Sequence, residues 1–241
     1  VLTDPARSVS VRAHAPRALV EIDAPRSVEP LLEGLLIERD GFVRYRILRA
    51  LHRVRRTRPA TPLDEDILGR AALAAVRSAH RYLAWRLFLE DGASRVVGRR
   101  NATRDLLCDL LAEKEENAVE RLFLVLALRY PREDFRRLLR ELRSGGCRAR
   151  ATGRELVENL LRGPARALTL ALIDEVDDRT RLLALAGGRP SRAPTDRRVL
   201  AAIRDEEGGG MLGALAARHA EELALDGSRA PAVVLAGVAG A

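Results

Sequence analysis

Apolar side chains recur at helical spacing between Gly41 and Arg58, in the segment GFVRYRILRALHRVRRTR. Four of them stand at positions i, i+4, i+8 and i+11: Val43, Ile47, Leu51 and Val54. This spacing places all four on one stripe of an α-helix. Half of the other positions are arginine, and no carboxylate lies among them. The pattern predicts an amphipathic helix with one face toward a core and the other toward water or an anion.

A shift of 32 residues aligns this segment with an earlier one. VRAHAPRALVEI (Val11 to Ile22) matches VRYRILRALHRV (Val43 to Val54), with identical residues at five of the twelve positions. The stretch between them, Ser27 to Glu38, is typical of a second helix. Ser27 is its expected N-cap, and Pro30 falls in the first turn, where proline is tolerated.

Pairs of short helices that repeat every thirty to forty residues are typical of an α-solenoid, because one pair cannot bury its apolar face alone. The sequence therefore predicts an all-α fold of stacked antiparallel helix pairs. The two aligned helices should be parallel neighbours in consecutive layers, with Leu19 and Leu51 both buried. The alternative is that two unrelated amphipathic helices share a composition rich in arginine and alanine.

Two longer helices are expected next, from Asp64 to Leu89 and from Thr103 to Arg129. They predict one helical hairpin that is longer than the repeat helices. Tyr82 and Trp85 flank the apolar stripe of the first helix, and we expect them in the core more than at a docking surface. Shorter helices are predicted at 133–143, 147–162, 166–175, 179–186, 197–206 and 211–225.

These elements suggest four divisions of the chain. Residues 1–90 hold the N-terminal helix pairs and the first long helix, and residues 91–186 hold the second long helix and the C-terminal pairs. Residues 187–196, GGRPSRAPTD, have the composition of a linker, and residues 197–241 form a terminal helical pair and an apolar tail. The chain opens on Val1 with what reads as the second half of a helix pair, so we expect it to be a piece of a longer protein.

Composition supports the helical interpretation and says little about ligands. Hydrophobic residues make up 47% of the chain but aromatic residues only 3%, and the alternation typical of a sheet is absent. The formal net charge is +8, and Lys114 is the only lysine among 42 basic residues. A GC-rich genome explains this preference for arginine better than selection for phosphate binding, so the charge alone is weak evidence of a nucleic-acid partner.

No familiar catalytic or metal-binding pattern is present. Cys108 and Cys147 match no metal or redox spacing and are expected to be core or partly buried thiols. The four histidines form no ligand pair, so we expect no metal, no cofactor and no catalytic residue. The segment GGGMLG (Gly208 to Gly213) matches G-x-G-x-x-G literally, but a charged helix precedes it, which favours a turn between helices over a nucleotide site. No apolar run approaches the 18 residues of a membrane span.

Two basic stretches remain as candidate interaction surfaces, residues 44–58 and 129–150. They can be solvated faces with local salt bridges, or they can line a surface for phosphate groups or anionic lipid headgroups. The residues that we single out are Arg44, Arg46, Arg49, Arg53 and Arg56.

Several segments resemble a known architecture. VRAHAPRAL followed by VEPLLEGLL and VRYRILRALHRVR is similar to the HEAT-repeat extension of bacterial proteins related to the nucleotide-transporter and major-facilitator families. ERLFLVLALRYP (Glu120 to Pro131) and GRELVENLL (Gly153 to Leu161) resemble later parts of the same extension. His52 departs from the asparagine expected there, and Val157-Glu158 departs from leucine-aspartate. The resemblance covers roughly residues 5 to 175 and implies a HEAT-like α-solenoid.

The resemblance also implies a cytoplasmic scaffold or regulatory module and supplies no catalytic residue. We therefore expect a non-enzymatic segment of a larger, transporter-related protein, in the cytoplasm or at the cytoplasmic face of a membrane. Its partner is expected to be another protein, the rest of its own chain or an anionic membrane surface. The alternative is a HEAT-like protein that binds nucleic acid with its arginine-rich surface.

Overall fold

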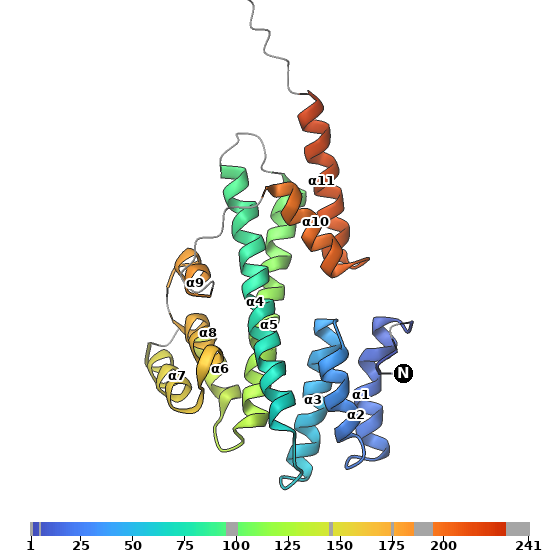
Figure 1. The fold of residues 1–241 in the computed structure, drawn as a ribbon, viewed down its shortest axis with the longest axis vertical. Coiled ribbons are helices and arrows are strands. Elements are labelled where there is room, and N and C mark those ends of the chain that lie inside the picture. The colour runs from blue at the N-terminus through green and yellow to red at the C-terminus, as the bar shows by residue number, and fades with distance from the viewer. Residues whose placement is uncertain are drawn as a thin grey trace, which may run out of the picture. The chain divides into compact units, whose positions relative to one another are not determined.

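The chain forms helices throughout the part that the structure describes. The computed structural model describes residues 2–4, 6–94, 101–144, 147–174, 176–185 and 195–229 (Figure 1). These residues form eleven helices and no strand, which confirms the all-α prediction. The helices are α1 (Val9–Ile22), α2 (Val28–Ile37), α3 (Gly41–Thr57), α4 (Glu65–Ser94), α5 (Ala102–Arg129), α6 (Phe135–Arg143), α7 (Cys147–Leu160), α8 (Gly163–Ile173), α9 (Asp178–Leu185), α10 (Asp196–Glu207) and α11 (Met211–Arg229).

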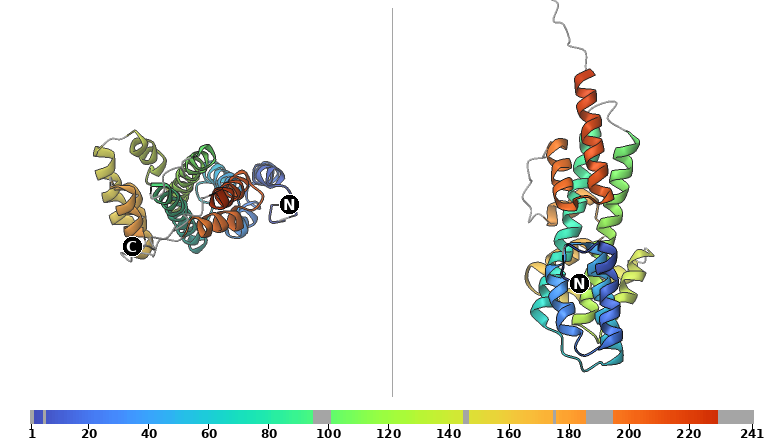
Figure 2. Two further views of the ribbon diagram at one scale, coloured as in Figure 1. Left: turned by 90° about the horizontal axis from the view of Figure 1, so that it is seen from above. Right: turned by 90° about the vertical axis from the view of Figure 1, so that its right-hand side faces the viewer.

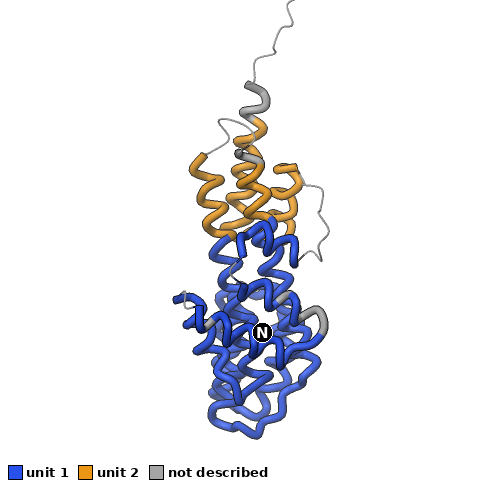
Figure 3. Tube along the Cα trace, turned by 90° about the vertical axis from the view of Figure 1, so that its left-hand side faces the viewer, with its two compact units in different colours: residues 1–84, 112–191 blue, residues 85–111, 192–241 orange. Residues whose placement is uncertain are grey.

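The chain divides into two compact units (Figure 3). The first comprises residues 1–84 and 112–191, and the second comprises residues 85–111 and 192–241. Both long helices, α4 and α5, contribute to both units, so these units cut across the divisions at 90/91 and 186/187 that the sequence suggested. Most of the expected linker and the whole apolar tail after residue 229 lie outside the described residues.

Within the first unit, α1 and α3 pack against each other and run parallel (Figure 1). Arg46 Nε donates a hydrogen bond to the carbonyl oxygen of Ala13 at 3.3 Å. Nearer the C-terminal ends of both helices, the guanidinium of Arg53 lies 3.5 Å from the carboxylate of Glu21. The contacts advance along both helices in the same direction, at separations of 33 and 32 residues, as predicted for the aligned segments. Helix α2 returns between them in sequence and also packs against α3.

The prediction that both equivalent leucines of this layer are buried is correct for only one of them. Leu51 is fully buried, as predicted, whereas Leu19 is partly exposed. In α1 the buried residues are Ala13, Pro16 and Val20. Helix α3 packs against both α1 and α2 and buries six side chains, whereas α1 buries three. The position of a residue in the aligned sequences therefore does not fix its burial, because burial depends on how many neighbours the helix has.

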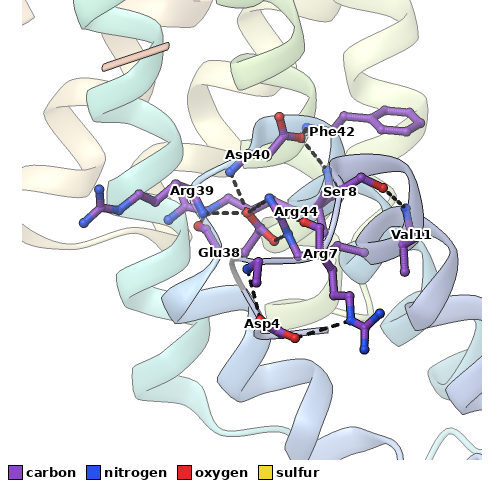
Figure 4. Close-up of polar contacts among 12 residues, drawn as sticks. Asp4, Arg7, Ser8, Val11, Glu38, Arg39, Asp40, Phe42 and Arg44 are labelled. Carbon is purple, nitrogen blue, oxygen red and sulfur yellow. Dashed lines mark hydrogen bonds and ion pairs between the residues drawn. The ribbon is translucent and has the colours of Figure 1, made fainter. Parts of the chain in front are cut away.

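The buried carboxylate of Glu38 accepts several hydrogen bonds at the N-terminal end of this layer (Figure 4). The carboxylate of Glu38, just after α2, accepts hydrogen bonds from Arg12 Nε at 2.8 Å and Nη2 at 3.2 Å. It also accepts the backbone N–H groups of Arg39 and Asp40. The Asp40 side chain in turn caps α3 by accepting the N–H of Val43. The expected N-cap of α2, Ser27, instead donates its hydroxyl to the carbonyl of Ala24, so it occupies the cap position without capping the helix.

The remaining helices of the first unit continue from the long pair. Arg129 near the end of α5 pairs with Glu65 at the start of α4 at 2.9 Å, so the two helices are antiparallel. The Phe135 ring at the start of α6 packs edge-on against Phe123 of α5, with centroids 6.2 Å apart. Consecutive helices α6 to α9 then pack against one another. Arg181 of α9 pairs with the buried Glu115 of α5 at 3.0 Å, which fixes the end of this series.

The second unit contains the antiparallel pair α10 and α11, which lie side by side in Figures 1 and 2. The turn between them uses Gly208, whose φ of 58° is a backbone conformation suited to glycine. Gly213 lies against this turn, and a Cβ there would collide with the carbonyl oxygen of Gly208. The glycine-rich segment is therefore a tight connection between helices. The Glu222 carboxylate accepts hydrogen bonds from Asn101 and Thr103 at the start of α5.

Candidate anion-binding pocket

A cavity of about 780 Å³ within the first unit gathers most of the arginines of α3. Its walls come from α1, α3, α5, α6 and the residues that follow α3 and α5. Seven arginines line it, and no aspartate or glutamate of the described chain is among the lining residues. We call this set the arginine pocket: Arg17, Arg46, Arg49, Arg53, Arg55, Arg56 and Arg136.

The sequence of α3 places four of these arginines on one stripe. They are separated by three, four and three residues, which is the spacing of one helix face: Arg46, Arg49, Arg53 and Arg56. Elsewhere around the helix, the apolar stripe is fully buried: Val43, Ile47, Leu51 and Val54. Burial of this stripe fixes the rotation of α3 about its axis. With this rotation, all four arginines of the stripe line the cavity.

Two pocket arginines are held by neutral groups. Arg46 Nε donates to the backbone of Ala13, and its guanidinium lies 5.9 Å from the centre of the Phe42 ring. Arg49 Nη1 donates to the hydroxyl oxygen of Tyr45 at 2.9 Å and lies 5.7 Å from the centre of that ring. A carbonyl, a hydroxyl or a ring orients a guanidinium without cancelling its charge. Both cations are therefore positioned but not neutralised.

Three further arginines also lack a carboxylate partner in the described part of the chain. Arg55 Nη1 donates to the backbone oxygen of Thr61 at 3.4 Å. Arg56 and Arg136 have exposed side chains, and neither forms a hydrogen bond or an ion pair with any described residue. Like charges gathered around one cavity repel one another. An anion that enters the cavity relieves this repulsion.

One nearby carboxylate partly offsets the charge. Glu21 of α1 accepts a hydrogen bond from Arg17 Nε at 2.7 Å and lies 3.5 Å from Arg53. The hydrogen bond from Arg17 and the attraction of both arginines lower the pKa of Glu21, so it is ionised at neutral pH. Glu21 thus occupies two of the seven arginines and leaves five.

His52 lines the pocket as a neutral residue that connects α3 to α5. Its Nε2 lies 2.9 Å from the carbonyl oxygen of Leu124, which the neutral ring satisfies by donating its Nε2 proton. Burial lowers the pKa of His52, and the nearby positive charges of Arg136, Arg49 and Arg55 lower it further. The ring is therefore neutral at pH 7. The described lining residues include no serine, cysteine or carboxylate that could serve as a nucleophile or base, so the arrangement suits binding of an anion.

Four of the five arginines singled out from the sequence line the pocket, and Arg44 does not. Arg44 Nε donates to the carbonyl oxygen of Glu38 at 2.6 Å, and its side chain borders a smaller cavity beside Leu48 and Val125. The reason is rotational. Arg44 precedes Arg46 by two residues, which places it on nearly the opposite side of the helix.

The sequence interpretation missed three arginines of the pocket. Arg17 aligns with Arg49 in the 32-residue repeat, so the alignment contained a signal for it. Arg55 lies beside the arginine stripe of α3. Arg136 belongs to the second basic stretch, which had no evident connection to the first. In that stretch Arg129 pairs with Glu65 and Arg137 pairs with Glu141, whereas Arg136 reaches the pocket.

The cysteines and the aromatic pair that the sequence analysis singled out do not line the pocket. Cys108 is buried, and burial raises the pKa of its thiol to about 11. Cys147 is exposed, so the expectation of two core or partly buried thiols is correct only for Cys108. Tyr82 and Trp85 are both buried, as predicted. Among the described residues, no group of three or more histidine, cysteine, aspartate and glutamate side chains could hold a metal ion.

Of the helices that the structure describes, none combines the length and the apolar character needed to cross a membrane.

Comparison with known proteins gives no family assignment. No protein-family model, curated protein or solved structure matches the chain.

Proposed function

We propose that this chain is a non-enzymatic, HEAT-like scaffold or regulatory module that binds an acidic segment of a partner protein in the arginine pocket. In this proposal it works in the cytoplasm as part of a larger, transporter-related protein. The observation that carries the proposal is the set of five pocket arginines without a carboxylate partner among the described residues. Such a set favours recognition of an anion.

The arrangement of the N-terminal helices supports a stacked scaffold. Helices α1 and α3 are parallel neighbours, and α2 packs on α3 between them in sequence. This is the relation expected of equivalent helices in consecutive pairs of a solenoid. The arginine pocket draws residues from both α1 and α3, so a ligand there contacts two successive layers. Solenoids commonly bind their partners across several repeats.

The shape and lining of the pocket favour a protein segment over a nucleic-acid duplex. A cavity of about 780 Å³ accommodates a few side chains. A duplex presents its phosphates along an extended track and is best met by a basic surface of similar length. Tyr45, the aromatic residue of the pocket, already packs against the Arg49 guanidinium, so it is not a ready platform for stacking a base.

The proposal is tested with a fluorescein-labelled decaglutamate peptide and a 20-base-pair duplex of random sequence, both titrated with the whole chain at about 0.15 M salt. We expect saturable binding of the peptide, and loss of that binding in the variant Arg49→Gln/Arg56→Gln/Arg136→Gln. We expect only weak binding of the duplex. Tight duplex binding that is abolished by the same variant would instead establish the nucleic-acid alternative.

The wider context has a separate test. The coding sequence on either side of this segment should encode a membrane translocator in the same reading frame. A reading frame that encodes a nuclease, a glycosylase or another DNA-processing domain would contradict the transporter-related context. The peptide titration is independent of that outcome.

A further inference from the structure

The arginine pocket holds more positive charge than a single carboxylate could balance. Five guanidinium groups without a carboxylate partner among the described residues border a cavity of about 780 Å³. Three of them are already oriented by neutral partners: Arg46 by the Ala13 carbonyl, Arg49 by the Tyr45 hydroxyl and Arg55 by the Thr61 carbonyl. Fixed, uncancelled charges in a small volume select a compact ligand with several negative charges.

We propose that the arginine pocket binds a compact polyphosphate group, and that this ligand competes with the acidic protein segment for the same arginines. The inference rests on the proposed function only for the competition. Direct binding of the polyphosphate requires no partner protein. The ligand class is defined by two or more linked or adjacent phosphate groups, whether free in solution or carried on a lipid headgroup.

Charge density distinguishes phosphate from carboxylate here. A terminal or monoester phosphate carries about 1.5 to 2 negative charges at neutral pH and an internal phosphate of a linear chain carries about one, so about three groups balance the five arginines. Five carboxylates would bring five side chains and their backbone into the same cavity. The planar fork of arginine also matches the oxygens of phosphate, and its hydrogen bonds to phosphate are charge-assisted.

Glu21 is an internal competitor for the arginines of this site. It is ionised, and it engages Arg17 and Arg53 beside the five arginines that have no carboxylate partner among the described residues. A polyphosphate that recruits Arg17 or Arg53 must displace Glu21, and one that does not is repelled by it. Glu21 therefore lowers the affinity of the pocket. Replacing Glu21 with an uncharged residue should therefore tighten polyphosphate binding. This is the opposite of the effect expected when a pocket arginine is replaced.

The test is isothermal titration of the whole chain with sodium tripolyphosphate at about 0.15 M salt. One anion should bind per chain, more tightly than citrate or orthophosphate. Each arginine that contacts the anion should account for about a tenfold change in affinity, so Arg49→Gln/Arg56→Gln/Arg136→Gln should weaken binding by at least about a hundredfold. Glu21→Gln should strengthen it by a few-fold, roughly the range of an exposed ion pair.

A matched control removes the same charge elsewhere. Arg39, Arg70 and Arg77 are exposed residues of the first unit that lie outside the pocket. Their simultaneous change to glutamine should leave the affinity within about threefold, because screening at this salt limits distant charges. Far-ultraviolet circular dichroism and thermal unfolding show that each variant is folded. If the control triple weakens binding as much as the pocket triple, the anion responds to net charge and the proposed site is wrong.

Two further arms identify the source and separate this inference from the proposed function. Vesicles of phosphatidylcholine with and without phosphatidylinositol bisphosphate report whether a headgroup is bound in preference to the soluble anion, and either result supports polyphosphate chemistry. Tripolyphosphate should also displace the decaglutamate peptide. Equal affinity for citrate and tripolyphosphate, or no saturable binding, overturns the inference and leaves peptide binding standing. Polyphosphate binding without peptide binding overturns the proposed function alone.

Discussion

The Nε2 atom of His52 lies 2.9 Å from the carbonyl oxygen of Leu124, and this hydrogen bond joins α3 to α5 across 72 residues of sequence. His52 is itself a lining residue of the pocket, so this hydrogen bond holds α3 to α5 at the pocket wall. The neutral ring is the form that donates this bond while contributing no further positive charge to the pocket.

Stability should therefore decrease with acidity through the ordinary titration range of histidine. Burial lowers the pKa of His52 in the folded chain, and it also lowers the pKa of His80 and His219. The unfolded chain then binds more protons than the folded chain below about pH 6.5, so the free energy of unfolding falls as the pH decreases through that region.

The contribution of His52 is isolated by substitution. His52→Gln retains a side-chain N–H donor and cannot titrate, so the pH dependence of stability should become shallower while stability near pH 7.5 stays within about 1 kcal/mol. Urea unfolding at several pH values between about 5.5 and 7.5 measures both quantities. An unchanged slope in this variant would show that the fold does not hold His52 neutral.

The two equivalent leucines of the repeat should differ in their effect on stability. Leu51 is fully buried, whereas Leu19 is partly exposed. Leu51→Ala should lower the free energy of unfolding by about 2–5 kcal/mol, because it leaves a cavity in a packed layer. Leu19→Ala should cost less than half as much. Urea unfolding of both variants checks the prediction, and equal losses would mean that α1 buries its face as α3 does.

The turn between α10 and α11 offers a pair of glycines with opposite expectations. A Cβ at Gly213 would collide with the carbonyl oxygen of Gly208, whereas a Cβ at Gly209 would meet no atom within 4 Å. Gly213→Ala should destabilise the second unit by about 1–3 kcal/mol, because backbone must move to accept the methyl group. Gly209→Ala should be nearly neutral. Amide hydrogen exchange of α10 and α11 reports the local effect, and equal protection in the two variants would contradict the close approach.

The ion pair of Arg12 with the buried carboxylate of Glu38 should contribute more to stability than an exposed glutamate of α2. The Glu38 side chain is 5% exposed and holds Arg12 with two hydrogen bonds. Glu38→Gln should cost about 1–3 kcal/mol, since Arg12 then loses its ionised partner. Glu33→Gln, an exposed change on α2, should alter stability by no more than about 0.5 kcal/mol. Thermal unfolding of the two variants at pH 7 makes the comparison, with similar midpoints counting against the ion pair.

The positions of the helices and the rotation of α3 were determined by the sequence. Apolar residues at helical spacing specify which face must leave water. Glycine and proline were weaker signals for helix ends, since Pro16 lies inside α1 and α4 continues through Gly92 to Ser94. For α3 the apolar stripe leaves one orientation for Arg46, Arg49, Arg53 and Arg56. Even the parallel relation of α1 and α3 follows from their aligned patterns.

Tertiary structure alone decided which arginines meet in one cavity. Arg17, Arg56 and Arg136 come from three helices, and their convergence depends on how α1 and α6 pack beside α3. The pairing of Arg129 with Glu65 also depends on packing, since the two residues are 64 apart in sequence, whereas Arg137 pairs with Glu141 one turn further along the same helix. Helical periodicity is a local property, whereas burial and charge pairing between helices are set by neighbours that lie far away along the chain. The same physical reason leaves Leu19 partly exposed while its counterpart Leu51 is buried.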